Sequence, residues 1–300
     1  MRPECPVCLA ASAEESFSKD GYRHFDCRAC RALFLFPPPS REQLDRYYVA
    51  HAERTCSSQC WEREAQDYRH YEAIWGAALA DIERLSGRGP LLDVGCGGGQ
   101  FLAFARSRGW DELMGIEVSP PAAARARERS GAIVHECDFA SAGLEPERFA
   151  GVAMWNVIEH APRPRDFVRE VARLLRPGGA CVADCPNRFG VTLRAIGPRA
   201  YVVMPPEHVT YFSHTALRML LEAEGLRVRR LGSNTVYLND WLRFFGGPQE
   251  EARARKRHLA WYGRVTGSRL ALGAIGAANA LLDLARLGDQ LLVTAQKPDR

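Results

Sequence analysis

The sequence predicts an α/β fold, a mostly parallel sheet with helices on both faces, preceded by a small module stapled by a metal. Three observations support this prediction. From Pro90 onward, short apolar runs alternate with segments of helical periodicity, which is the pattern of a parallel sheet. Residues 91–102 indicate a strand, a glycine turn and a helix, an arrangement that can cradle a nucleotide. Two C-x-x-C pairs lie near the start of the chain.

Length, charge and cysteine content narrow the class of protein. The 300 residues suffice for one large domain and a small appendage, with a core that needs no disulfides. The formal net charge of +4 is spread over scattered arginines, so no basic stripe indicates nucleic acid. The chain starts inside a motif, without an apolar signal segment, and we expect a cytoplasmic protein. Its ten cysteines are then expected to be thiols or metal ligands.

Residues 1–40 are predicted to form a zinc ribbon. A short hairpin is expected between the two cysteine pairs, and the apolar run 33–36 forms a last strand before three prolines. A segment this short cannot build its own core, so the zinc is expected to be structural and to supply folding energy. The pairs have the spacing of a tetrahedral four-thiolate site: Cys5 with Cys8, and Cys27 with Cys30.

Residues 41–88 are predicted to be a helical linker or cap. Ser40 can cap its first helix, and a long helix with alternating aromatic and charged residues follows from about 61 to 85. We expect this helix to lie across the mouth of the next domain. Cys56 and Cys60 lack the second pair that a metal site needs and are expected to be ordinary thiols in a helix.

Residues 89–300 form the predicted main domain, with a helical insertion at about 247–288. In parallel sheets of this kind ligands bind outside the carboxyl ends of the strands, so functional residues are expected at those ends. The predicted strands cover residues 91–95, 114–118, 133–137, 151–156, 180–185, 226–232 and 290–297.

The loop after the first of these strands carries glycines at alternate positions. Gly95, Gly97 and Gly99 follow the strand acid Asp93, whereas the dinucleotide fingerprint requires a sixth-position glycine where this chain has Gln100. Glycines allow the backbone to approach a ligand closely and to adopt the positive φ that such turns need. The loop therefore lacks one of the three glycines that NAD binding requires, and a different nucleotide cofactor is expected.

The pattern Asp-x-Gly-x-Gly-x-Gly resembles the cofactor loop of class I S-adenosylmethionine (SAM) methyltransferases. The resemblance implies a Rossmann-like seven-stranded sheet whose last strand runs antiparallel, with SAM as the cofactor. The first forty residues likewise resemble the N-terminal module of bacterial zinc-ribbon methyltransferases.

The candidate cofactor residues combine this resemblance with position in the chain. Glu117 lies about 20 residues beyond the glycine loop, where an acid can accept hydrogen bonds from the two ribose hydroxyls. The resemblance implies that Asp138 binds the adenine amino group, that Phe139 lies against the ring, and that the motif at residues 154–160 lines the sulfonium side. The full set is Asp93, Gly95, Cys96, Gly97, Gly99, Glu117, Val118, Asp138, Phe139, Asn156 and Val157.

Two histidines are candidates for a general base. Glu207 and His208 lie in the loop after the fifth predicted strand, where an uncharged histidine beside a carboxylate can take a proton from a hydroxyl or an acidic carbon. Their Glu-His-x-x-Tyr-Phe-Ser string is similar to one in sugar C-methyltransferases and in quinone-precursor O-methyltransferases. His208, oriented by Glu207, is therefore the first candidate and His160 the second. A structural role for His208, packed before a helix capped by Ser213, stays open.

The predicted insertion combines a basic stretch at 248–264 with a largely apolar helix at 270–287. The apolar run is too short to span a bilayer. We expect a lid over the acceptor pocket or a homodimer contact, and peripheral docking on a membrane surface is the alternative.

Together these features predict a SAM-dependent methyltransferase that moves a methyl group to oxygen or carbon of a small-molecule acceptor, such as a sugar, a quinone-like compound or a secondary metabolite. Both acceptor atoms fit, because one base serves either reaction. Two other classes stay open. One is an RNA base methyltransferase that contacts RNA through the ribbon, which the acids among the arginines of residues 1–40 disfavour. The other is a non-catalytic binding protein.

Overall fold

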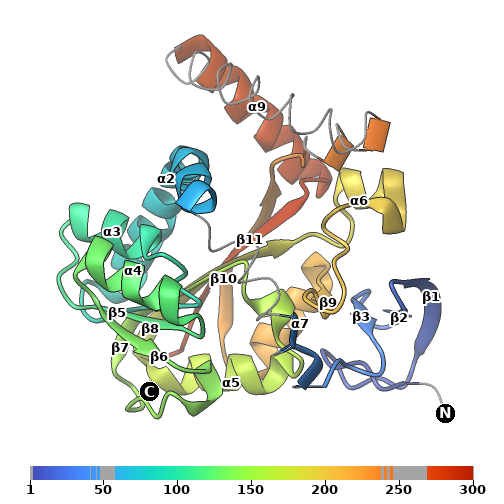
Figure 1. The fold of residues 1–300 in the computed structure, drawn as a ribbon, viewed down its shortest axis with the longest axis horizontal. Helices are drawn as coiled ribbons and strands as arrows, with labels where there is room; N and C mark the ends of the chain where they lie inside the picture. The colour runs from blue at the N-terminus through green and yellow to red at the C-terminus, as the bar shows by residue number, and fades with distance from the viewer. Residues whose placement is uncertain are drawn as a thin grey trace.

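Figure 1 shows the fold in a computed structural model, which describes residues 3–40, 42–44, 46–47, 58–237, 240–241, 244–245 and 269–299. The strands of this part of the chain form a seven-stranded sheet and a four-stranded sheet. The larger sheet runs through the middle of the molecule, and the smaller one lies to one side of it, near the N-terminus (Figure 1).

The larger sheet has the predicted mostly parallel character. Its strands are ordered β10-β11-β8-β7-β4-β5-β6, and β11 runs antiparallel to both of its neighbours, as the resemblance implied. β8 begins earlier than expected, because Leu175 already pairs with Phe149 of β7. The strands are β4 (Leu91–Val94), β5 (Leu113–Glu117), β6 (Ile133–Glu136), β7 (Phe149–Trp155), β8 (Leu175–Pro186), β10 (Arg227–Asn234) and β11 (Gln290–Gln296).

Burial on both faces explains why the central strands are continuous apolar runs. All four residues of β4 are buried, and so is β8 from Ala180 to Pro186. One face packs against α2, α3 and α4, and the other against α5 and α7. Val94 pairs with both Ile116 and Met154, so three strands end at the same level. The helices are α2 (Ser58–Ser86), α3 (Gln100–Ser107), α4 (Pro120–Ser130), α5 (Pro164–Leu174), α6 (Val191–Ile196) and α7 (His214–Ala223).

The long helix α2 is the expected linker helix, but its described side chains lie on the sheet face rather than across the mouth of the domain. Trp75 is buried, and its ring lies 5.8 Å from that of Phe101 and 6.2 Å from that of Trp155. Leu79 and Ile82 continue the same buried stripe. The apolar face of the helix therefore fixes it to the sheet. The side chains of the predicted thiol pair at positions 56 and 60 lie outside the described residues.

The N-terminal segment forms the predicted hairpin and last strand. β1 (Ala13–Lys19), β2 (Tyr22–Cys27) and β3 (Leu33–Leu35) pair antiparallel in sequence order. The fourth strand of this sheet, β9 (Thr210–Tyr211), comes from the segment that follows β8 and pairs with β3. Its neighbours in the chain also join the packing, since Phe34 of the ribbon belongs to the same buried cluster as Phe212. The ribbon therefore takes its last strand from the main domain.

The C-terminal helix α9 (Arg269–Ala285) falls within the predicted insertion, whereas residues 246–268 lie outside the described part of the chain. In Figure 1 this helix extends away from the central sheet. Asp283 anchors its end by accepting a hydrogen bond from the backbone N–H of Ser233 at 2.7 Å, while Leu281 and Leu284 are exposed. Among the described helices none is long and apolar enough to cross a membrane. The role of this helix as a lid or dimer contact stays a prediction.

Candidate active site

A cavity of about 930 Å³ opens at the carboxyl ends of the central strands. Its walls come from the ends of β4, β5, β6 and β7 and from α5. Pro39 at the end of the ribbon, Leu44 just after it, and Glu207 in the segment after β8 also line the cavity. Of the predicted cofactor residues, seven line this cavity: Gly95, Glu117, Val118, Asp138, Phe139, Asn156 and Val157.

The glycine loop and Glu117 form one side of the cavity. Gly95 has a φ of 68°, and a Cβ placed on it would come within 2.7 Å of Val157. The Glu117 carboxylate accepts hydrogen bonds from the backbone N–H groups of Gly97 at 2.9 Å and Ser119 at 2.8 Å. The Ser119 side chain makes no cap bond to α4. Glu117 therefore accepts the backbone N–H at the start of α4, and its side chain also lines the cavity.

Asp93 and the remaining loop residues lie outside the cavity wall. Asp93 is 2% exposed, and its Oδ1 has no hydrogen-bond partner among the described residues. Burial raises the pKa of this carboxyl well above its ordinary value, and the charge of Glu117 adds to the rise. Gly99 serves packing, since a Cβ there would meet the Cα of Ala126 at 2.6 Å. Cys96 and Gly97 complete the turn between the strand and the helix.

The opposite side of the cavity is built for a flat ring. The Asp138 Oδ1 accepts a hydrogen bond from the backbone N–H of Ala140 at 2.9 Å, which fixes the carboxylate at the end of β6. The ring of Phe139 packs 4.8 Å from that of Phe167 on α5. A carboxylate next to an aromatic wall offers a hydrogen-bond acceptor and a stacking surface, which together suit a purine whose exocyclic amine donates.

Asn156 is held by a buried polar group that sequence reasoning missed. It adopts a φ of 53°, and its backbone N–H donates to Asp184 Oδ1 at 2.7 Å. Gln290 Nε2 donates to both Asn156 Oδ1 at 2.8 Å and Asp184 Oδ2 at 2.9 Å. Burial raises the pKa of Asp184 to about 7. Asp184 could have been predicted as a site residue, because an acid near the carboxyl end of a parallel strand is a sequence signal. No local pattern in the sequence marks Gln290.

His160 and Glu207 face the cavity, whereas His208 packs behind them. His160 Nδ1 lies 3.0 Å from the carbonyl oxygen of Glu207, which can only accept, so Nδ1 carries the proton and Nε2 the lone pair. The Glu207 carboxylate accepts a hydrogen bond from the hydroxyl of Tyr47 at 2.7 Å. Burial lowers the pKa of His160, partly offset by the nearby Glu207 carboxylate.

His208 does not line the cavity. It is 7% exposed, its Nδ1 lies 2.7 Å from the carbonyl oxygen of Val202, and its ring meets that of His160 edge-on at 4.8 Å. Burial, together with repulsion from His160, lowers the pKa of His208 to about 3. The cavity is therefore lined by His160, the second candidate, and not by His208, the first, because the loop that carries His208 turns its ring into the protein.

Glu159 is another residue that sequence reasoning missed. It is fully buried, and neither carboxylate oxygen finds a hydrogen-bond partner in the described structure. Burial raises the pKa of this carboxyl well above its ordinary value. Its Oε1 lies 3.9 Å from His160 Nε2, and with His208 the three side chains place ligand atoms within 4.8 Å of one another. This group could hold a metal ion.

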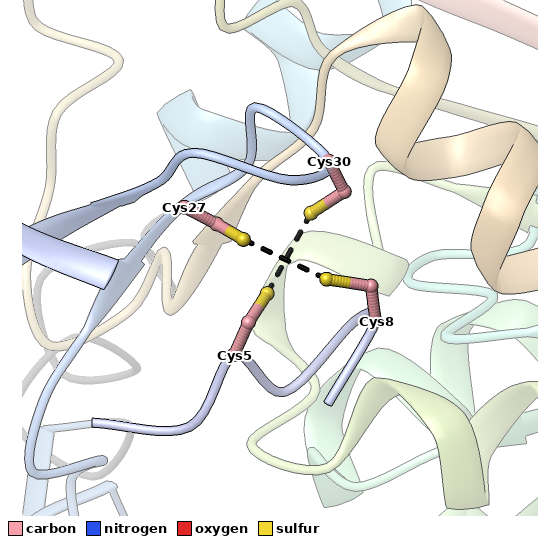
Figure 2. A group of neighbouring side chains, drawn as sticks. All are labelled: Cys5, Cys8, Cys27 and Cys30. Carbon is pink, nitrogen blue, oxygen red and sulfur yellow. Dashed lines mark hydrogen bonds between the residues drawn. The ribbon is translucent and has the colours of Figure 1, made fainter. Parts of the chain in front are cut away.

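The four predicted zinc ligands come together in the ribbon. Figure 2 shows their sulfur atoms converging on one point, with Cys5 opposite Cys30 and Cys8 opposite Cys27 at 3.6 Å each. A Zn–S bond of about 2.3 Å in tetrahedral geometry places two sulfurs about 3.8 Å apart. The donor set therefore fits zinc. Burial raises the pKa of the Cys8 thiol to about 11, and a divalent cation would counter this by stabilising the thiolate.

Comparison with known proteins agrees with the fold of the main domain. Residues 66–231, more than half of the chain, match a family described as a methyltransferase domain. Two ubiquinone biosynthesis O-methyltransferases are among the relatives. The one from Pseudomonas fluorescens is 29% identical over 51% of this chain and 67% of its own length. The one from Klebsiella pneumoniae is 30% identical over 52% of this chain and 69% of its own length.

Solved structures agree at the level of the fold. A chain in the complex between the Haloferax volcanii Trm112 methyltransferase activator and a methyltransferase superimposes with a TM-score of 0.55. It is 18% identical, and the match covers 82% of this chain and 98% of that one. The two O-methyltransferases named above align over about two thirds of their own lengths.

Proposed function

This chain belongs to the methyltransferase domain family, and on that premise we propose that it transfers a methyl group from SAM to a hydroxyl oxygen of a small-molecule acceptor. The observation that carries the proposal is one cavity whose lining combines two acids, an aromatic ring and a neutral imidazole. The names of the curated relatives favour oxygen and a quinone-precursor type of acceptor. Carbon stays the alternative acceptor atom.

The residues divide into a cofactor side and an acceptor side. The unpartnered buried oxygen of Asp93 suits an ammonium group, Glu117 suits a ribose, and Asp138 with Phe139 suits adenine. When bound, SAM supplies an electrophilic methyl group on a sulfonium. His160 Nε2 takes the proton of the acceptor hydroxyl, and the Glu207 carbonyl holds the opposite ring nitrogen in its protonated form. His208 supports the ring from behind.

Positioning accounts for the rest of the chemistry. The sulfide is a neutral leaving group, so the protein mainly has to hold two reactants in line and remove one proton. Pro39 and Leu44 add apolar surface to the cavity lining. The end of the ribbon thus forms part of the cavity wall.

The ribbon itself is proposed to bind one structural zinc. Four thiolates leave no open coordination position, so the ion would contribute folding energy rather than chemistry. The described cysteines form no disulfide, and unpaired cysteines are typical of a reducing compartment. This supports a cytoplasmic location.

Native mass spectrometry and calorimetry test the proposal on the full chain. We expect one zinc per chain in the purified protein and saturable SAM binding. Glu117→Gln should weaken SAM binding at least tenfold, because the amide cannot accept both backbone bonds and a ribose hydroxyl. Glu112→Gln, an exposed change before β5, should leave binding unchanged. Absence of SAM binding to the wild-type chain would favour the non-catalytic binding protein, and methylation of RNA alone would favour the RNA enzyme.

A further inference from the structure

The segment between β8 and α7, residues 187–213, is attached to the ribbon at its start. Arg188 donates hydrogen bonds from its guanidinium to both carboxylate oxygens of Asp26 on β2, with N···O distances of 3.0 Å and 3.3 Å. The backbone N–H of Arg188 donates to the carbonyl oxygen of Phe212 at 2.7 Å. Asp26 therefore holds the point where the segment leaves the sheet and the point where it returns. The pair is partly buried, with Arg188 17% exposed.

The middle of the segment is attached by a second ribbon side chain. Lys19, at the end of β1, donates from its ammonium group to the carbonyl oxygens of Val203 at 2.6 Å and Ala200 at 3.3 Å. The neighbouring carbonyl of Val202 is the hydrogen-bond partner of His208. The position of the His208 ring is thus linked to the ribbon through one peptide unit.

The end of the segment completes the ribbon sheet. The backbone N–H of Leu35 donates to the carbonyl of Val209 at 2.9 Å, and Thr210 pairs with Phe34. The hydroxyl of Ser213 donates to the carbonyl of Cys30 at 2.8 Å. Glu207 lies between the second and third attachment points, and its carbonyl accepts the Nδ1–H of His160.

We propose that Asp26 and Lys19 of the ribbon are positioning residues for the acceptor side of the site. They act through residues 187–213, which place the Glu207 carbonyl against His160 Nδ1 and so fix the tautomer that leaves the lone pair on Nε2. The inference rests on the proposed function for its catalytic meaning. The attachment itself is independent of SAM, because none of these contacts involves the glycine loop or Glu117.

The imidazole tautomer of His160 gives a direct readout. Nitrogen-15 chemical shifts distinguish Nδ1–H from Nε2–H imidazole, and hydrogen exchange reports the backbone of residues 204–211. We expect Asp26→Ala to produce a mixture of His160 tautomers and to raise amide exchange at His208 and Val209 at least tenfold. Asp26→Glu should restore both readouts substantially, because a carboxylate can again bind Arg188. SAM affinity and zinc content should stay within twofold of wild type.

Arg28→Ala is the matched control. Arg28 is adjacent to Cys27, as Asp26 is, but its ion pair with Glu14 joins two residues of the ribbon. The control should leave the His160 tautomer and the exchange rates at wild-type values. Lys19→Met provides a second test that leaves the cysteine region untouched and should raise exchange around Val203 and His208.

Three results would overturn the inference. They are an unchanged His160 tautomer in Asp26→Ala, an equal change in Arg28→Ala, and a loss of SAM affinity that matches the loss of amide protection. Absence of SAM binding to the wild-type chain would reject the proposed function alone, because the tautomer and exchange readouts need no cofactor.

Discussion

At the scale of single residues, the acceptor side depends on which imidazole nitrogen is available as a base. The carbonyl of Glu207 keeps the proton on His160 Nδ1, so Nε2 is left with its lone pair. The His208 Nδ1 is committed in the same way to the carbonyl of Val202. The two adjacent rings thus have the same tautomer but different surroundings. His160 lies at the cavity wall, and His208 is packed behind it.

His160→Gln is expected to lower turnover by about 10² to 10⁴, the range of general base catalysis, because the glutamine amide cannot take the acceptor proton. His208→Gln should lower turnover less, since it removes packing rather than a group at the cavity. Transfer of labelled methyl from SAM, with SAM affinity measured in parallel, checks both variants. A larger loss in His208→Gln would restore that residue as the base.

Burial of His208 predicts that the folded protein loses stability at acid pH. The pKa of His208 falls to about 3 on folding, so the unfolded chain binds more protons than the folded one between about pH 3 and 6.5. The free energy of unfolding therefore falls as pH drops through this window. Asp184 acts in the opposite sense, because its burial raises its pKa to about 7.

The two effects are separated by comparing variant and wild type in urea unfolding at pH 7, 6, 5 and 4. His208→Asn should flatten the dependence on pH by at most about 1.4 kcal/mol per pH unit, the value for one proton. Parallel curves for the two proteins would mean that His208 binds no fewer protons when folded than when unfolded.

At the scale of elements, one hydroxyl joins a helix to the ribbon. Ser213 is the N-cap of α7, where its Oγ accepts the backbone N–H of Ala216 at 3.0 Å and donates to the carbonyl of Cys30. Ser213→Ala should lower the free energy of unfolding by about 1–2 kcal/mol, since it removes both bonds from a buried site.

Ser119, the N-cap of α4, provides the control, because it makes no side-chain cap bond. Ser119→Ala should therefore change stability by less than about 0.5 kcal/mol. Similar losses in the two variants, measured by urea unfolding, would count against this role of Ser213.

At the scale of the whole molecule, the ribbon and the main domain share a sheet and a core. The buried cluster that contains Phe34 also contains Phe212 and Leu217, and β9 links the two parts by backbone pairing. Cooperative unfolding of such a unit exposes both parts together. We expect differential scanning calorimetry to show one transition for the metal-loaded chain, and chelation of the zinc to move that transition to lower temperature. Two separate transitions would show that the ribbon unfolds independently.

Local patterns made much of this molecule predictable. The seven strands, the glycine loop and the cysteine pairs could be predicted because periodicity, glycine spacing and ligand spacing act within short stretches. β9 could not, since a two-residue strand has no periodicity and its partner is distant in the chain. The order of the two histidines and the role of Gln290 also depend on long-range packing. His160 and His208 carry similar local signals, and only the folded loop decides which ring meets the cavity.

The pairing of β3 with β9 also orders events during synthesis. Cys30 and Ser213, which are bonded in the folded protein, are 183 residues apart in the chain. At about 5–20 residues per second, a ribosome needs roughly 10 to 40 s to cover that distance. The ribbon is synthesised before the segment that completes its sheet, so β3 and the carbonyl of Cys30 lack their final partners for that interval. We therefore expect the ribbon sheet of the nascent chain to stay three-stranded until β9 has been synthesised.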